Sequence, residues 1–281
     1  MPDRRDEEVI TPHLLRRWQL PDPQGDKQSR GTVLVVGGSR FNPGAVLLAG
    51  VAALRSGAGR LQLAVAEESA VALSIAVPEA KVVGLPAGGE APGEVLELAA
   101  DADVIAIGPG LDDIGQTTAV MRAVLGAAGE DTAVVLDAYA LGALSKDAGL
   151  LRQRRAVLTP NVTEAGHLLG HDPGDDLGAA AGALAERYGA VVSLYGHIAD
   201  PDGGAWREES GDAGLGTSGS GDARAGVVAG LLGRGADPAQ AACWAAYVHA
   251  VSGQRISPRY GRTGFLAREL VDEVAYTIAT I

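Results

Sequence analysis

The chain contains little cysteine, few aromatic residues and no long apolar run. Its only cysteine, Cys243, cannot form a disulfide within the chain, which agrees with a reducing compartment, and we expect a cytoplasmic protein. The first residues are polar and charged, so we expect no secretory signal. No segment approaches the roughly 18 apolar residues of a membrane span. The sequence therefore predicts neither a disulfide-stapled scaffold nor a membrane protein.

Positive charge is also scarce. The formal net charge at pH 7 is −12, and no long basic run interrupts the sequence. A chain of this charge repels polyanions, so we expect neither nucleic acid nor an anionic membrane as a partner. A small anionic ligand, such as a nucleotide, would have to be held by local backbone donors.

Short apolar runs alternate with helix-like segments through most of the 281 residues. The runs predicted as strands are 32–36, 60–65, 81–85, 104–107, 133–136, 156–158 and 191–194. This alternation predicts an α/β fold with a mostly parallel sheet. A turn at 201–204 predicts a hairpin, and the chain after Asp222 is expected to form three helices, over 223–233, 238–252 and 264–279.

The domain organisation expected from this pattern is simple. Residues 1–30 are polar and are predicted to form an N-terminal arm with one short helix near 11–18. Residues 31–281 show no internal repeat and no clear boundary, so they are predicted to form a single domain.

The most informative segment is glycine-rich and runs from Gly214 to Gly226. Four glycines lie between 214 and 221, Asp222 follows at once, and a helix is predicted to start there. A glycine-rich turn at a helix start gathers free N–H groups at the positive end of the helix dipole, which binds phosphate. A carboxylate would repel that phosphate, so Asp222 is better explained as a base or an indirect metal contact. The alternative is an ordinary loop with Asp222 as the helix N-cap.

Polar or glycine-rich turns follow several other predicted strands. They lie at residues 37–44, 108–111, 137, 159–164 and 195–197. Because ligands of open α/β sheets bind beyond the carboxyl ends of the strands, these turns are expected to line one long crevice.

At these residues the sequence resembles the NAD(P)H-hydrate dehydratase family, a branch of the ribokinase-like superfamily. The resemblance covers about residues 30–280. It is carried by Val-Val-Gly-Gly-Ser-Arg-Phe-Asn-Pro-Gly-Ala at 35–45, Leu-Arg-Ser-Gly-Ala-Gly at 54–59, Gly-Pro-Gly-Leu at 108–111, Leu-Asp-Ala at 136–138, Thr-Ser-Gly-Ser-Gly-Asp at 217–222 and Tyr-Val-His at 247–249. It implies a ribokinase-like three-layer α/β/α sandwich with a mostly parallel central sheet.

The resemblance also implies a repair reaction. The hydrated nicotinamide of NADHX or NADPHX would be dehydrated to NAD(P)H with ADP or ATP as co-substrate, and Mg²⁺ could accompany the nucleotide. Phosphoryl transfer to the C6 hydroxyl, followed by loss of phosphate, is the implied route. Asp222 would be the catalytic base, and the family's oligomers lead us to expect a homo-oligomer, a tetramer. A nucleotide and phosphate site is implied for Thr217, Gly219, Ser220, Gly221, Asn161, Glu164, Tyr195 and Arg224. A substrate site is implied for Asn42, Pro43, Gly44, Ala45, Gly108, Pro109, Gly110 and Asp137.

The chain departs from the family pattern at several of these positions. Tyr195 stands where the family usually has lysine, and Arg224 where it usually has leucine. Arg224 could restore a cation in the crevice or could point to solvent. Asn161 and Glu164 are similar to the Asn-x-x-Glu motif with which kinases of the superfamily organise Mg²⁺ near phosphates.

Two alternative functions therefore stay open at this stage. One is an ATP- and Mg²⁺-dependent kinase of a small molecule, favoured by Asn161 and Glu164. The other is a non-catalytic nucleotide-binding relative, favoured by the altered positions 139, 161, 195 and 212. The retained Asp222 argues against the second.

The histidines and serines suggest little further chemistry. The five histidines are too scattered to predict a metal site, and His249 lies among small apolar residues, which favours a core position. Ser218 and Ser220 have no histidine near them in the sequence, which argues against a serine nucleophile.

Overall fold

A ten-stranded sheet forms the centre of the molecule in a computed structural model that describes residues 7–22, 30–88, 90–151 and 154–281. Its strand order is β1-β10-β9-β8-β7-β6-β5-β2-β3-β4. Neighbouring strands are parallel except at the β8–β9 and β9–β10 pairs. The strands are β1 (Glu8–Val9), β2 (Thr32–Val36), β3 (Arg60–Ala66), β4 (Ala80–Leu85), β5 (Val104–Ile107), β6 (Ala133–Leu136), β7 (Ala156–Leu158), β8 (Val191–Leu194), β9 (His197–Ala199) and β10 (Ala205–Arg207).

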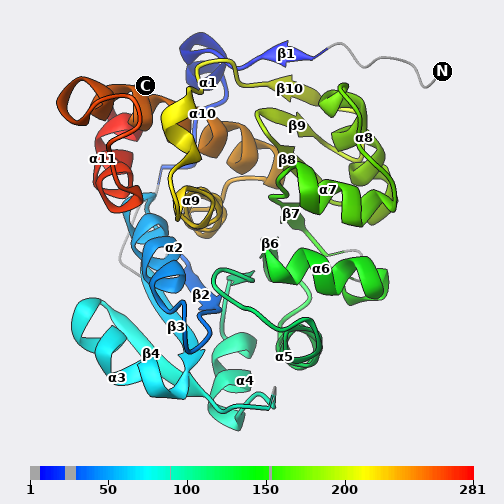
Figure 1. Cartoon of the computed structure of the whole chain (residues 1–281), viewed down its shortest axis with the longest axis vertical. Helices are drawn as coiled ribbons and strands as arrows, with labels where there is room; N and C mark the ends of the chain where they lie inside the picture. The colour runs from blue at the N-terminus through cyan, green and yellow to red at the C-terminus, as the bar shows by residue number, and fades with distance from the viewer. Residues whose placement is uncertain (1–6, 23–29, 89, 152–153) are drawn as a thin grey trace.

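Helices cover both faces of this sheet, as Figure 1 shows. They are α1 (Pro12–Arg17), α2 (Gly44–Arg55), α3 (Glu67–Ala76), α4 (Gly93–Ala100), α5 (Ile114–Ala127), α6 (Tyr139–Lys146), α7 (Val162–Leu169), α8 (Leu177–Tyr188), α9 (Ser220–Gly233), α10 (Pro238–Tyr260) and α11 (Ala267–Ala279), with 3₁₀ turns η1 (Ala148–Leu150) and η2 (Ala213–Gly216). The α/β fold class is confirmed, as are the seven predicted parallel strands, the hairpin and the three C-terminal helices. Helix α10 ends at Tyr260, eight residues beyond the end at 252 that the sequence predicts.

Alternation along the strands divides the core into two layers. Val33 and Val35 of β2 pack with apolar residues of α2, α9, α10 and α11. Leu34 and Val36, one residue out of phase, pack with those of α4 to α8 on the other face. A parallel strand buried on both faces must be apolar throughout, which explains why the predicted strands are continuous apolar runs.

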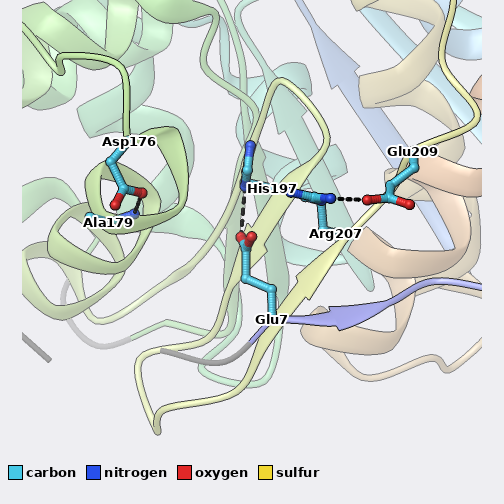
Figure 2. Close-up of polar contacts among 6 residues, drawn as sticks. All are labelled: Glu7, Asp176, Ala179, His197, Arg207 and Glu209. Carbon is cyan, nitrogen blue, oxygen red and sulfur yellow. Dashed lines mark hydrogen bonds and ion pairs between the residues drawn. The ribbon is translucent and has the colours of Figure 1, made fainter. Parts of the chain in front are cut away.

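The N-terminal segment is fastened to one edge of the sheet. Its predicted helix is α1, capped by Thr11. Strand β1, which pairs with β10, was not predicted from the sequence. The Glu7 carboxylate lies 2.6 Å from His197 Nδ1 on β9, and Figure 2 shows this contact beside the Arg207–Glu209 ion pair. The ring centroids of Trp18 and Trp206 lie 5.5 Å apart, so Trp206 packs against the N-terminal segment.

Aspartates cap α5 and α8, two of the helices on the face of the sheet that α4 to α8 cover. Asp113 Oδ1 accepts a hydrogen bond from Gln116 N at the start of α5, and Asp176 Oδ1 accepts one from Ala179 N at the start of α8. The second contact is drawn in Figure 2. Each bond satisfies an N–H that has no partner within the helix.

Helices α2 and α9 approach each other backbone to backbone. A Cβ atom added at Gly226 would lie 2.1 Å from the carbonyl oxygen of Ala49, and one at Gly230 would lie 2.3 Å from that of Ala53. No real Cβ fits at such distances, so glycine at these two positions permits the contact. This contact fixes the start of α9 against α2.

We expect Gly226→Ala to lower the free energy of unfolding by about 1–3 kcal/mol, because the methyl group forces the two helices apart. Gly126→Ala is the matched control, since Gly126 lies in α5 with open space around its Cβ position. The control should be neutral or stabilising by up to about 1 kcal/mol. Urea unfolding monitored by circular dichroism measures both. Equal stability of Gly226→Ala and wild type would contradict the close helix contact.

Candidate functional site

The chain reverses its direction across the sheet at β2. From β2 it proceeds to β3 and β4 on one side, and then returns to β5 on the other side. Such a switch point opens a crevice at the carboxyl ends of the two central strands. The loops that follow β2 and β5 meet there, because Gly38 N donates to Pro109 O at 2.7 Å and Ser39 N donates to Gly110 O at 2.7 Å.

Glycine in the second of these loops is required by the protein's own backbone. A Cβ at Gly108, whose φ is +125°, would lie 1.8 Å from Asp137 O, and one at Gly110 would lie 2.4 Å from Asn42 O. The substrate contact that the family resemblance implies for these glycines is therefore not needed to explain why they are glycines. In the first loop, Pro43 is the N-cap of α2, Ala45 is buried, and a Cβ at Gly44 would meet open space.

Asp137 lies at the carboxyl end of β6 and is buried. Thr159 Oγ1 donates a hydrogen bond to Asp137 Oδ1 at 2.7 Å. Burial raises the pKa of Asp137, while the Thr159 bond and the Arg224 charge oppose this rise. The next residue, Ala138, has a φ of +49°, which is strained for a residue with a Cβ atom.

The glycine-rich segment forms a tight turn directly before α9. Ser220 N donates to Thr217 O at 3.2 Å, and Gly219 has φ 86° and ψ −4°, the values of the third residue of a type II turn. A Cβ at Gly219 would lie 2.5 Å from Leu48 Cδ1 of α2, whereas one at Gly221 would meet nothing within 4 Å. The fold therefore requires glycine at 219, whereas position 221 leaves room for a ligand at its α-carbon.

Asp222 is the third residue of α9 and is half-buried. Gly219 is the N-cap of this helix, so the alternative in which Asp222 caps it is wrong. Burial, and secondly the charge of Asp137, raise the pKa of Asp222 to about 7. A carboxylate with such a pKa can take up and release a proton near neutral pH, which a general base requires.

Arg224 points inward, toward Asp137 and Glu164. Its Nη2 donates to Thr159 O at 3.0 Å, and its Nε is buried without a hydrogen-bond partner among the described residues. Burial lowers the pKa of Arg224, and the two carboxylates raise it. Of the two orientations that the sequence left open, the one toward solvent is wrong.

Asn161 and Glu164 form a capping box at the start of α7. Asn161 Oδ1 accepts from Glu164 N at 2.9 Å, and Glu164 Oε2 accepts from Asn161 N at 2.9 Å. Helix capping therefore accounts for this pair of residues without a metal ion. In the described parts of the chain, no group of three or more histidine, cysteine, aspartate or glutamate side chains could hold a metal ion.

A cavity of about 570 Å³ opens beside the first turn of α9. Four residues of the predicted nucleotide site line it, namely Tyr195, Ser220, Gly221 and Arg224. Thr217 and Gly219 belong to the adjoining turn, and Asn161 and Glu164 lie behind Arg224, outside the lining. Asp222 and the predicted substrate residues are likewise outside it.

Tyr195 lies in the tight turn between β8 and β9. Both residues of this turn have positive φ, +48° at Tyr195 and +90° at Gly196, which is the pattern of a type I′ hairpin turn. The side chain of Tyr195 is 75% exposed, so its phenol stands at the edge of the cavity rather than inside it.

Sequence reasoning missed several polar residues that line the cavity, among them Glu208 and His249. Glu208 accepts from Ser210 N at 2.6 Å and from Gly211 N at 3.0 Å, and nothing in the local sequence marks it. His249 is buried as predicted, but its Nε2 lies 2.7 Å from Ser220 Oγ, although no histidine is close to Ser220 in the sequence. The only available signal was the Tyr-Val-His motif at 247–249.

Burial, together with the nearby Arg224 charge, lowers the pKa of His249 to about 3. An imidazole that resists protonation so strongly is a poor general base. The low basicity of His249 thus argues against a serine nucleophile at Ser220, although a histidine does lie beside this serine.

None of the helices in the described ranges is long and apolar enough to cross a bilayer. Basic residues are scarce around the cavity, as they are in the whole sequence. Arg224 is the one arginine or lysine among the residues that line the cavity.

Comparisons with known proteins agree with this geometry. A family model described as NAD(P)H-hydrate dehydratase matches residues 33–275. The chain is 44% identical to the ADP-dependent (S)-NAD(P)H-hydrate dehydratase of Xanthomonas campestris pv. campestris, over 95% of this chain and 94% of that protein.

Solved structures of similar proteins share the fold of this chain. The ADP/ATP-dependent NAD(P)H-hydrate dehydratase of Bacillus subtilis, co-crystallised with ATP and Mg²⁺, superposes with a TM-score of 0.83 at 30% identity, covering 98% of this chain and 99% of that one. A ribokinase-like superfamily protein of Enterococcus faecalis superposes with a TM-score of 0.86 at 23% identity, over 98% and 96% of the two chains, which confirms the ribokinase-like fold. The chain belongs to the NAD(P)H-hydrate dehydratase family.

Proposed function

We propose that this protein is an ADP-dependent NAD(P)H-hydrate dehydratase, a lyase that converts NADHX or NADPHX back to NAD(P)H. Family membership supports the proposal, as does the 44% identity to a relative that bears this name over nearly the whole of both chains. The observation that carries it is the position of Asp222. This residue lies in the first turn of α9, with a pKa near neutrality and next to a cavity that fits a ligand of nucleotide size.

The phosphates of the nucleotide are proposed to bind at the start of α9. Backbone N–H groups of Gly219 and Gly221 would stabilise the charge on the transferred phosphoryl group. Ser220 N donates to Thr217 O and closes the turn that presents them. Open space at Gly221 allows a phosphate to come close to the backbone. This arrangement suits a chain of net charge −12, since it relies on oriented dipoles more than on basic side chains.

The hydrate is proposed to bind at the switch point, against Asn42, Pro43, Gly44 and Ala45 and beside Gly108, Pro109, Gly110 and Asp137. The Asp222 carboxylate would take the proton of the C6 hydroxyl while that oxygen attacks the terminal phosphorus of ADP, with AMP as the leaving group. The C6–O bond then breaks and phosphate departs with both electrons. Loss of a proton from the neighbouring ring carbon restores the ring double bond.

The direct test is recovery of absorbance at 340 nm when purified protein is incubated with NADHX or NADPHX and with ADP, with ATP in parallel. We expect recovery that depends on the nucleotide. No recovery with either nucleotide or with either hydrate would overturn the proposed function.

We further propose that the protein is a cytoplasmic homo-oligomer, a tetramer, as in the family pattern.

Replacing Asp222 by asparagine should lower kcat by about 10²–10⁴-fold, because general-base removal has this effect. ADP affinity, measured by calorimetry, should not fall, since no negative charge faces the phosphates in the variant. Near-normal kcat would rule out Asp222 as the base.

The same variant should be more stable than wild type at pH 8. The pKa of Asp222 is about 7 in the folded protein and 3.8 in its ordinary state, so the folded protein binds more protons between these values and loses stability as pH rises. The gain from Asp222→Asn should therefore grow from about pH 4 to about pH 7 and stay constant above it. Thermal unfolding across this range measures the difference, and a gain independent of pH would contradict the raised pKa.

We propose that Arg224 supplies the cation that the family usually places at position 195. Arg224→Gln keeps an N–H donor toward Thr159 O but removes the charge, and ADP binding should weaken about tenfold, equivalent to roughly 1.4 kcal/mol. Arg224→Lys is the control that keeps the charge.

Tyr195→Lys should change ADP affinity by less than about twofold at moderate salt, because position 195 is exposed at the edge of the cavity. A large gain from Tyr195→Lys with no loss from Arg224→Gln would assign the phosphate contact to position 195 instead.

A further inference from the structure

One buried contact in the cavity has no part in the reaction as proposed. Ser220 is the first residue of α9, and His249 comes from the middle of α10, 29 residues later. Ser220 is 3% exposed and His249 is 8% exposed, and both line the cavity. His249 Nε2 lies 2.7 Å from Ser220 Oγ and 3.1 Å from the backbone oxygen of the same residue.

One tautomer of His249 satisfies both distances. A carbonyl oxygen can only accept a hydrogen bond, so the 3.1 Å contact is a hydrogen bond when Nε2 carries the hydrogen. In that tautomer Ser220 Oγ, at 2.7 Å, accepts from the same N–H. The hydroxyl hydrogen of Ser220 is then left free of His249. Since burial keeps the imidazole neutral, this arrangement should persist over the ordinary pH range.

We propose that His249 is a positioning residue that turns the Ser220 hydroxyl group toward the cavity, so that its hydrogen is donated to a phosphate oxygen of the bound nucleotide. The side-chain donor adds to the backbone N–H groups at the start of α9, where a neutral donor is useful in a site with a single cation. A hydroxyl at the first position of a helix otherwise tends to bond to nearby backbone groups. The contact with Nε2 holds the serine oxygen away from that alternative.

This inference rests on the proposed nucleotide site, but binding alone can test it. Calorimetry with ADP and with adenosine, which lacks phosphate, separates a phosphate contact from general damage to the cavity. Ser220→Ala should weaken ADP binding about tenfold to a hundredfold, the usual effect of losing a hydrogen bond to a charged group. Its affinity for adenosine should stay within about twofold of wild type.

Variants of His249 test the positioning role. His249→Leu removes the donor to Ser220 and should also weaken ADP binding, by less than Ser220→Ala. His249→Gln can place a side-chain N–H near the position of Nε2 and should restore most of the affinity. Because His249 acts through Ser220, the double variant with Ser220→Ala and His249→Leu should bind ADP no more weakly than Ser220→Ala.

Ser252→Ala is the matched control. Ser252 is a buried serine on α10 that bonds to Thr277 Oγ1 at 3.0 Å, and it does not line the cavity. It should leave the affinities for both ligands unchanged, and thermal unfolding checks that every variant is folded. Additive losses in the double variant, or equal losses for ADP and adenosine, would overturn the inference. Recovery of 340 nm absorbance by wild type tests the proposed dehydratase function separately, so the two failures are distinguishable.

Discussion

The backbone contact between α2 and α9 is the constraint on which the site depends. Gly226 and Gly230 bring α9 against the carbonyl groups of Ala49 and Ala53, and the start of α9 is thereby held beside the start of α2. Figure 1 shows the two helices side by side on one face of the sheet. The first turn of α9 carries Ser220, Gly221 and Asp222, and α2 begins directly after the loop proposed to bind the hydrate. A larger separation would move Asp222, the proposed base, away from the switch point.

Few charged side chains lie around the first turn of α9. Asp137 and Glu164 lie near the inward-pointing Arg224, and burial, together with the charge of Asp137, raises the pKa of Asp222. Folding therefore retains an arrangement that opposes stability at neutral pH, which is common where a residue is set up for proton transfer. Neutral donors around the same turn give an anion a favourable environment without a strongly basic surface.

The fold explains how two departures from the family pattern, at positions 195 and 224, are related. Position 195 lies in a type I′ turn in which both residues have positive φ, so its side chain is held at the edge of the cavity. Arg224, one turn after Ser220 on α9, brings a guanidinium group to the interior of the same cavity. The change from lysine at 195 and the gain of arginine at 224 are thus spatially related, although 29 residues separate them.

Much of this protein follows from local sequence. Continuous apolar runs predict strands buried on both faces, and the glycine-rich turn before Asp222 predicts an anion site, because both are short-range properties of the backbone. Other features depend on contacts between distant segments. No local pattern indicates that His249 contacts Ser220 or that Arg224 points inward, since side-chain direction and proton position depend on neighbours that only folding brings together. For the same reason the glycines at 108 and 110, which the sequence links to a ligand, are required by the backbone of Asp137 and Asn42.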